Sequence, residues 1–302
     1  MRMKFLLTAM LLAVLLTTTG VVQASPEVIY NKRSLYRNIT VTDDGEKICM
    51  QFASRGYYTS QQSCQYKDDA DELVFDYTRM SFVGLLVEPK PERILVVGLG
   101  GGSIPRTFDR LFPEAQIDVV EIDPAVVDVA ERFFGFKEGG NVDVTVKDAR
   151  VFVKQAGIFG QEYDYIVLDA FNGDYIPAHL MTREWLEECR KILSDDGVLV
   201  ANTFSVSQLY HNESVTYEAA FGWMLNVRQN SGNRIILTGN IEPVDRDALL
   251  AAAETMNASR FEAFGFTPEW LAESSRDEVD WNRSATVLTD QYAPVNILQG
   301  RE

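Results

Sequence analysis

Acidic residues follow three successive strand-like segments of this chain, and a glycine-rich turn follows the strand-like segment before them. In chain order the segment ends are Gly98-Leu99-Gly100-Gly101-Gly102, Glu121-Ile122-Asp123, Asp148-Ala149, Asp169-Ala170-Phe171-Asn172 and Asn202. In an open α/β sheet the ligand binds beyond the carboxyl ends of the strands, so these residues should line one site. A carboxylate at such a place can accept hydrogen bonds from hydroxyl groups, or take a proton from an attacking amine.

The spacing of the glycines indicates which ligand the turn would bind. A dinucleotide fingerprint reads G-x-G-x-x-G, but Ser103 takes the place of its third glycine. The glycines instead form G-x-G-x-G, which resembles the first motif of the class I S-adenosylmethionine-dependent fold. No lysine follows them as in a phosphate-binding loop. Gly98, Gly100 and Gly102 are therefore predicted to contact an adenosyl-sulfonium ligand, and the alternatives are a dinucleotide or no ligand.

The acids after the second and third strands suit the rest of a nucleoside. Glu121 follows the glycines at about the spacing of a ribose-binding acid, which accepts both ribose hydroxyls. Asp148 and Ala149 are expected to meet an adenine amino group. Asp123 joins the predicted nucleoside contacts, although it precedes Pro124 and could simply cap the next helix.

Asp169 ends the fourth strand, beside the expected position of a sulfonium carbon. There it could orient an amine and accept its proton during attack on the carbon next to sulfur. The segment DAFNGDYIPAHL that begins at Asp169 could also be no more than a tight, capped loop. We take Asp169 as the predicted catalytic residue.

Strand and helix patterns place these residues on an α/β fold. Residues 25–70 alternate apolar and polar side chains around Asp44-Gly45, which predicts a small N-terminal unit of β-hairpins. Residues 72–88 have helical spacing, and five short apolar runs then alternate with helical segments. The prediction for residues 71–302 is a doubly wound, Rossmann-like catalytic domain with a mostly parallel sheet.

Composition and the N-terminal segment restrict the partners and the compartment. Residues 1–24 combine Arg2 and Lys4 with an apolar run and end in Val22-Gln23-Ala24, which resembles a signal-peptide cleavage site. The pattern predicts a cleaved secretory signal or, alternatively, an uncleaved anchor. The expected protein is exported, periplasmic or secreted, without membrane attachment after cleavage. A net charge of −16 argues against nucleic acid. Cys49 and Cys64 could be bridged, and the spacing of Cys and His predicts no metal site.

Taken together, the motifs resemble the spermidine synthase family, the polyamine aminopropyltransferases. The likeness runs from about Arg33 to Asn296 and includes VVGLGGGSIPR, DVVEIDPAVV, DAR, YDYIVLDAFNGD and LTDQYAPVN. The resemblance implies transfer of an aminopropyl group from decarboxylated S-adenosylmethionine to a small amine such as putrescine. It also implies that Glu121 binds ribose, Asp148 adenine and Asp169 the attacking amine, that Gln62 reaches the nucleoside, and that the chain forms a homodimer.

The chain departs from the family pattern in the amine-binding half. Gly101 stands where the family has an acid that holds the aminopropyl amine, and Asp76-Tyr77-Thr78 replaces Tyr-His-Glu. Asn172 replaces a second acid of the catalytic loop, with Asp174 nearby. Tyr77, Asn172 and Asp174 are therefore the predicted amine contacts. The departures leave two further hypotheses open: a methyltransferase that uses intact S-adenosylmethionine, and a catalytically silent polyamine- or nucleoside-binding protein.

Overall fold

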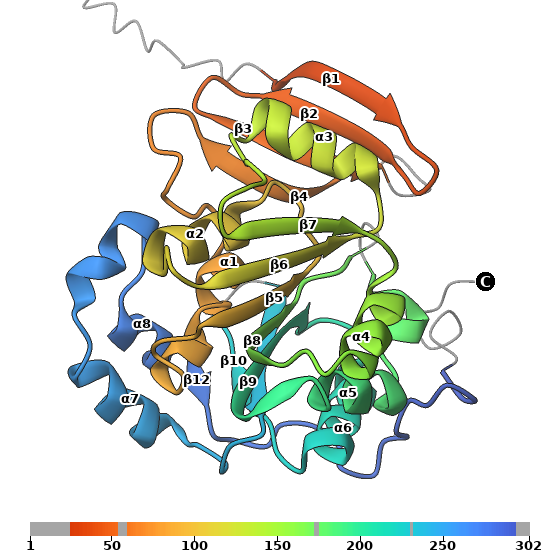
Figure 1. Cartoon of the computed structure of the whole chain (residues 1–302), viewed down its shortest axis with the longest axis vertical. Coiled ribbons are helices and arrows are strands. Elements are labelled where there is room, and N and C mark those ends of the chain that lie inside the picture. The colour runs from red at the N-terminus through yellow and green to blue at the C-terminus, as the bar shows by residue number, and fades with distance from the viewer. Residues whose placement is uncertain (1–24, 54–58, 172–174, 230–231, 294–302) are drawn as a thin grey trace, which may run out of the picture.

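A computed structural model describes residues 25–53, 59–171, 175–229 and 232–293 of this chain (Figure 1). Its main sheet has eight strands in the order β12-β10-β11-β9-β8-β5-β6-β7. The parallel strands are β5 (Arg93–Val97), β6 (Gln116–Glu121), β7 (Val142–Val146), β8 (Tyr163–Leu168) and β9 (Leu193–Phe204). The antiparallel strands are β10 (Leu225–Val227), β11 (Asn233–Gly239) and β12 (Ser275–Arg276). The predicted doubly wound, mostly parallel sheet is confirmed.

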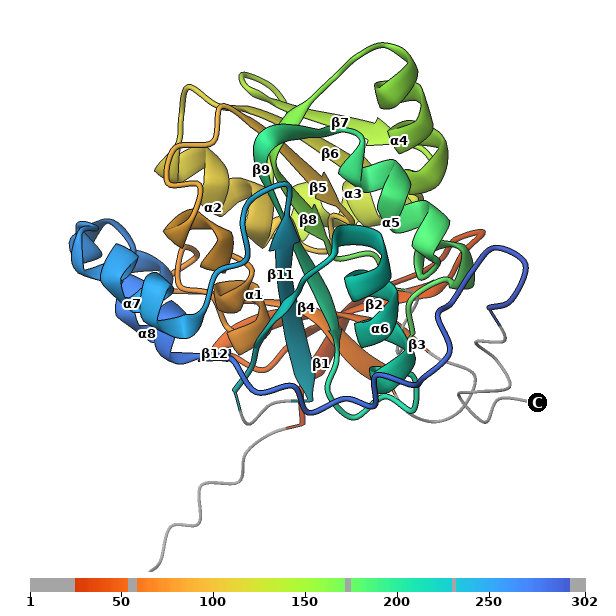
Figure 2. The same ribbon diagram turned by 90° about the horizontal axis from the view of Figure 1, so that it is seen from below.

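The sheet carries an apolar layer on each face, because successive strand residues point to opposite sides. Ile94 and Val96 enter the core beneath α1 (Asp76–Met80), α2 (Ser103–Leu111), α3 (Pro124–Phe133), α7 (Arg246–Glu254) and α8 (Pro268–Glu273). Leu95 and Val97 enter the core beneath α4 (Ala149–Ile158), α5 (Arg183–Arg190) and α6 (Tyr210–Phe221). Figure 2 shows the two helical layers on either side of the sheet. The strands read as continuous apolar runs because both of their faces are buried.

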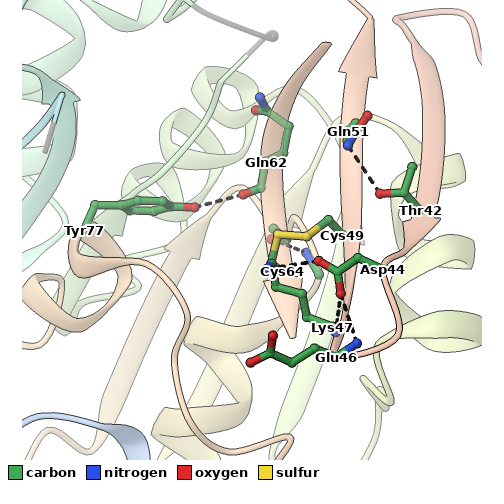
Figure 3. The surroundings of a disulfide bond; sticks show 11 residues. Thr42, Asp44, Glu46, Lys47, Cys49, Gln51, Gln62, Cys64 and Tyr77 are labelled. Atoms are coloured by element: carbon green, nitrogen blue, oxygen red, sulfur yellow. Dashed lines mark hydrogen bonds and ion pairs between the residues drawn. A yellow bond between two sulfur atoms is a disulfide. The ribbon is translucent and has the colours of Figure 1, made fainter. Parts of the chain in front are cut away.

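A second, antiparallel sheet precedes the main one. It consists of β1 (Glu27–Arg33), β2 (Asn38–Asp43), β3 (Lys47–Ala53) and β4 (Thr59–Tyr66), in that order. Buried residues of β2 and β3 join the first core, so the small sheet packs on the main domain. Cys49 of β3 and Cys64 of β4 are directly paired and form a disulfide, with Gln62 and Tyr77 nearby (Figure 3). The bridge that the sequence left open is therefore present.

Residues 72–88 do not form the single helix that the apolar spacing predicts. Helix α1 ends at Met80, and a short 3-10 helix, η1, covers Val83–Leu86. The Tyr165 hydroxyl donates to the Ser81 carbonyl at 2.7 Å and accepts from Gly84 N–H at 3.0 Å. It therefore takes up backbone groups that a continuous helix would pair internally. The remaining 3-10 turns of the described chain cover Ala178–Leu180, Ala258–Arg260 and Glu262–Phe264. Among the described residues, no helix is both long and apolar enough to cross a bilayer.

Candidate active site at the carboxyl edge of the main sheet

The glycine turn lies between β5 and α2, pressed against the end of β8. Gly98 has a φ of +99°, and a Cβ on it would collide with the backbone oxygen of Asp169. Gly102 has a φ of +77°, and its Cβ would stand 2.5 Å from the Phe136 ring. Both positions therefore need glycine, and the turn brings bare backbone up to the end of β8, where the predicted catalytic residue lies. This is the close approach that a bound nucleoside would exploit.

The small sheet holds the same turn from the other side. Gly101 N–H donates to the Ser63 hydroxyl at 2.8 Å, and Ser63 is the neighbour of the disulfide residue Cys64 on β4. Ser63 is buried, so the bond is shielded from water. The disulfide and the glycine turn are thus connected through one residue.

Glu121 ends β6 and is buried beside the turn. Its Oε2 accepts from Leu99 N–H at 3.1 Å, and its Oε1 accepts from Asp123 N–H at 2.9 Å. Burial raises the pKa of Glu121, while the nearby Arg37 guanidinium opposes that rise. A carboxylate has about four lone-pair sites, so each oxygen can still accept a ribose hydroxyl. The arrangement fits the predicted ribose-binding role.

Asp123 is engaged by protein groups on both oxygens. Oδ1 accepts from Ala125 N–H at 3.0 Å, which caps α3, and Oδ2 accepts from the Ser34 hydroxyl. Arg37 Nε lies 3.7 Å from Oδ2, and Arg37 Nη1 donates to the Phe171 carbonyl at 3.0 Å. Asp123 is 1% exposed. It therefore caps a helix and ties the small sheet to the main domain, and its contact with a nucleoside stays a prediction.

Asp148 and Ala149 begin α4, as the adenine-binding prediction requires. Asp148 Oδ1 accepts from Val151 N–H at 3.0 Å and caps the helix, while Oδ2 lies 2.9 Å from His179 Nε2. The next residue, Arg150, forms ion pairs at 2.7 Å with both Glu188 and Asp290. The motif that supplies Asp148 thus also fixes the C-terminal segment against α5. Nothing in the sequence pattern had pointed to His179.

Asp169 follows β8 and faces the centre of this edge. Its Oδ1 accepts from Asn202 Nδ2 at 2.8 Å, and the side chain keeps partial exposure. Burial raises the pKa of the Asp169 carboxyl to about 7, with a further rise from Glu121 and a partial reversal from the Asn202 hydrogen bond. A carboxyl with a pKa near 7 can exchange a proton at neutral pH, which suits a general base.

Tyr77 contacts Gln62 of the small sheet and lies near enough to Asp169 to be affected by its charge. The Tyr77 hydroxyl donates to the Gln62 backbone carbonyl at 2.9 Å (Figure 3). Burial raises the pKa of Tyr77, and the charge of Asp169 adds to that rise. Tyr77 is therefore a neutral phenol next to the predicted catalytic acid. Asn172 and Asp174 lie outside the described residues, so their predicted amine contacts remain predictions.

A small, mostly apolar cavity opens behind this edge of the sheet. Its lining consists of Val97, Leu168, Ala170, Ile176, Leu180, Trp185, Asn202 and Tyr217. Asn202 brings the amide that holds Asp169 to the wall of this cavity. In the part of the chain that the structure describes, no group of three or more His, Cys, Asp or Glu side chains could hold a metal ion.

Comparison with known proteins identifies the family. The model of the spermine/spermidine synthase domain matches residues 74–224. A polyamine aminopropyltransferase of Vibrio vulnificus (strain CMCP6) is 46% identical over 293 residues, which is 96% of either chain. The chain belongs to the spermine/spermidine synthase family. The resemblance predicted from the motifs is thereby confirmed.

Solved structures with the same fold include family members and methyltransferases. A probable spermidine synthase from Corynebacterium glutamicum ATCC 13032 has a TM-score of 0.63 and 19% identity, covering 86% of this chain and 99% of its own. That likeness shows the fold alone. Human methyltransferase-like protein 13 in complex with SAH has a TM-score of 0.52 and 25% identity, covering 68% and 92%. The Rossmann-like domain of this family member is thus shared with methyltransferases.

The structure gives a physical reason for the departure at Gly101. A Cβ at this position would lie 3.0 Å from the Phe134 ring and 3.1 Å from Ser63 Cβ. Both neighbours are buried, so any side chain at this position would require them to shift by a few tenths of an ångström. The acid expected by resemblance is absent here, and the tight packing favours glycine at this position.

Proposed function

We propose that this protein transfers the aminopropyl group of decarboxylated S-adenosylmethionine to a small amine, of which putrescine is the reference case. The observation that carries the proposal is Asp169: its backbone packs against Gly98, and its carboxyl has a pKa that burial and the charge of Glu121 raise to about 7. The relative from Vibrio vulnificus, named a polyamine aminopropyltransferase, supports the same assignment.

The proposed reaction is a displacement at the carbon next to the sulfonium. The amine nitrogen forms a bond to that carbon, the carbon–sulfur bond breaks, and methylthioadenosine leaves with the electron pair. Asp169 accepts the proton that the nitrogen loses. Glu121 would hold the ribose, Asp148 and Ala149 the adenine, Gln62 would reach the nucleoside, and Tyr77 would border the amine. Gly98 and Gly102 would admit the nucleoside because neither carries a side chain.

Calorimetry and product analysis test the proposal directly. Purified protein is titrated with methylthioadenosine, S-adenosylmethionine and its decarboxylated form, and then assayed with the decarboxylated donor and a panel of diamines. Binding of methylthioadenosine together with an aminopropylated product would support the proposal. Binding without product from either donor would leave the silent binding protein as the better description, and no binding at all would reject both.

A methyltransferase is the second candidate, and the packing around Gly101 favours it. Gly101 carries no acid to hold an aminopropyl amine, and a Cβ added there would press on Phe134 and Ser63. The 25% identity to human methyltransferase-like protein 13, solved with SAH, points the same way. Tighter binding of intact S-adenosylmethionine than of the decarboxylated form, with methylated product, would select this candidate.

Export is a further part of the proposal. The signal pattern of residues 1–24 suggests it, and the disulfide between Cys49 and Cys64 supports it because cytosolic proteins seldom keep such bonds. Cell fractionation of a tagged chain, compared with a chain that starts at residue 25, would test it. Recovery of the full chain only in the cytosol would contradict export. A homodimer also remains a proposal, to be tested by light scattering.

A further inference from the structure

Two asparagines form a chain of hydrogen bonds that ends at Asp169. Asn202 Nδ2 donates to Asp169 Oδ1 at 2.8 Å, and Asn233 Nδ2 donates to Asn202 Oδ1 at 3.0 Å. Asn202 lies on β9 and Asn233 begins β11, and the two strands pair antiparallel, with Asn202 opposite Ile235. The chain therefore crosses from the catalytic strand β8 through its neighbour to the strand beyond.

The hydrogen-bonding capacity of an amide gives this chain a direction. A carboxamide has one accepting oxygen and one donating nitrogen. Because Asn233 donates to the oxygen of Asn202, the nitrogen of Asn202 is the group that faces Asp169. Asn202 is 4% exposed, so water hardly competes for either contact. A reversed Asn202 amide would set its oxygen against the Asp169 carboxylate and its nitrogen against the nitrogen of Asn233.

A donated hydrogen bond acts on Asp169 in two ways. It favours the charged carboxylate over the neutral acid, which opposes the effects of burial and of Glu121. It also fixes Oδ1, whereas Oδ2 receives no hydrogen bond from the described residues. Among the described residues, the titratable groups that interact electrostatically with Asp169 are Glu121 from β6 and Tyr77 from α1.

We propose that Asn202 and Asn233 are positioning residues that hold one oxygen of Asp169 and leave the other for the attacking amine. The inference rests on the proposed role of Asp169 as general base. The inference also assigns a role to the antiparallel part of the sheet. Asn233 lies on β11, beyond residues 74–224, which the family model matches. Asn233 acts on the carboxyl only through Asn202.

The test is a carbon-13 NMR titration of the Asp169 carboxyl in the full protein, with Asp169→Asn used to assign the signal. The Asn202→Ala variant should raise the pKa by about one unit, because a hydrogen bond to a charged group is lost. The Asn233→Ala variant should raise it by about half as much, and should add nothing in the Asn202→Ala background. The inflection of kcat/KM with pH should move upward by the same amounts.

Asn240→Ala is the matched control. Asn240 follows the other end of β11 and donates to carbonyls of the α5–β9 region, including Leu193, and so should leave the pKa of Asp169 unchanged. Unchanged titration in Asn233→Ala would overturn the proposal, and this variant decides the matter even where Asn202→Ala does not fold. Transfer activity is a separate readout. If the pKa shifts as expected but the protein makes no product, the hydrogen-bonded chain from Asn233 to Asp169 is supported and the proposed function is rejected.

Discussion

The two halves of the candidate site differ in what holds their acidic side chains in place. The donor half comprises Gly98, Gly100, Gly102, Glu121 and Asp148, and its acids accept hydrogen bonds from backbone N–H groups. The amine half comprises Tyr77, Asp169 and Asn202, and here the acid is held by another side chain. The donor half is therefore fixed by the course of the chain, and the amine half by the identity of a few residues.

This difference explains where the chain keeps the family pattern and where it departs from it. A substitution far from the strands leaves a backbone-held acid in place, because the turn itself provides the donors. A side-chain pair changes whenever either partner changes. By the resemblance, the departures at Gly101 and at Asp76-Tyr77-Thr78 concern the amine, whereas the acids predicted to bind ribose and adenine are kept. One fold can thus retain a nucleoside while its second substrate changes.

Asp169→Asn should separate the two halves most strongly. The variant keeps an oxygen for the Asn202 amide but cannot accept the amine proton, so kcat should fall about 1,000-fold. The dissociation constant for methylthioadenosine, measured by calorimetry, should stay within about threefold. Asp195→Asn, an exposed acid near the start of β9, is the matched control and should retain full activity. A comparable loss of nucleoside affinity in Asp169→Asn would show that the halves are not independent.

Loss of the Cys49–Cys64 disulfide should weaken the support of the donor half. The bond closes a loop with a sequence separation of 15, and its removal should lower the free energy of unfolding by about 3 kcal/mol. Through Ser63 and Gly101 it should also weaken methylthioadenosine binding, by about threefold. Denaturant unfolding and calorimetry, with and without a dithiol reductant, measure both effects. The Cys49→Ala/Cys64→Ala variant is the control and should not respond to the reductant, and equal stability of the oxidised and reduced wild type would contradict the prediction.

The sequence was informative where chemistry coincides with the end of a strand. The glycine turn, Glu121, Asp148 and Asp169 each follow an apolar run, and the sheet edge assembles them without long-range information. The parallel direction of the main strands follows from the same alternation of strand and helix. These features are local, so a single sequence reveals them.

Contacts between distant segments could not be read in the same way. Helix α6 escaped prediction because its buried face includes Glu213 and Ser214, which bond to the fully buried Arg234 of β11. The break after α1 depends on the hydroxyl of Tyr165, 84 positions from Ser81. The hydrogen bond between Asn202 and Asn233 depends on the register of an antiparallel pair. None of these leaves a periodic signal along the chain.

Glu121→Gln should damage the donor half while leaving the amine half intact. One of the two backbone N–H groups that Glu121 serves would face an amide N–H instead of an oxygen, and the charge that favours the ribose hydroxyls would be lost. The dissociation constant for methylthioadenosine should rise about 30-fold. Glu114→Gln, at an exposed position before β6, serves as the matched control. Unchanged affinity for methylthioadenosine in Glu121→Gln would show that Glu121 does not bind the ribose.

The smallest expected effect is on stability, and it concerns the amine half alone. The pKa of Asp169 is raised to about 7 in the folded protein from an ordinary value of 3.8, so the folded state binds the proton more tightly than the unfolded chain. The resulting stabilisation is complete below about pH 4 and is lost as the pH rises through 7. Partial exposure of Asp169 reduces it, and we expect about 1–2 kcal/mol between pH 5 and 8.

The measurement compares denaturant unfolding of wild type and Asp169→Asn at pH 5 and pH 8. Glu121 and Glu213 also have pKa values raised by burial, and both contribute to the pH dependence of each protein. The difference between the two proteins removes these shared contributions and isolates Asp169. The variant should gain stability relative to wild type as the pH rises, because it carries no charge to bury. A constant difference across this range would mean that Asp169 is hydrated like a surface acid, and the proton-accepting role proposed for the amine half would lose its physical basis.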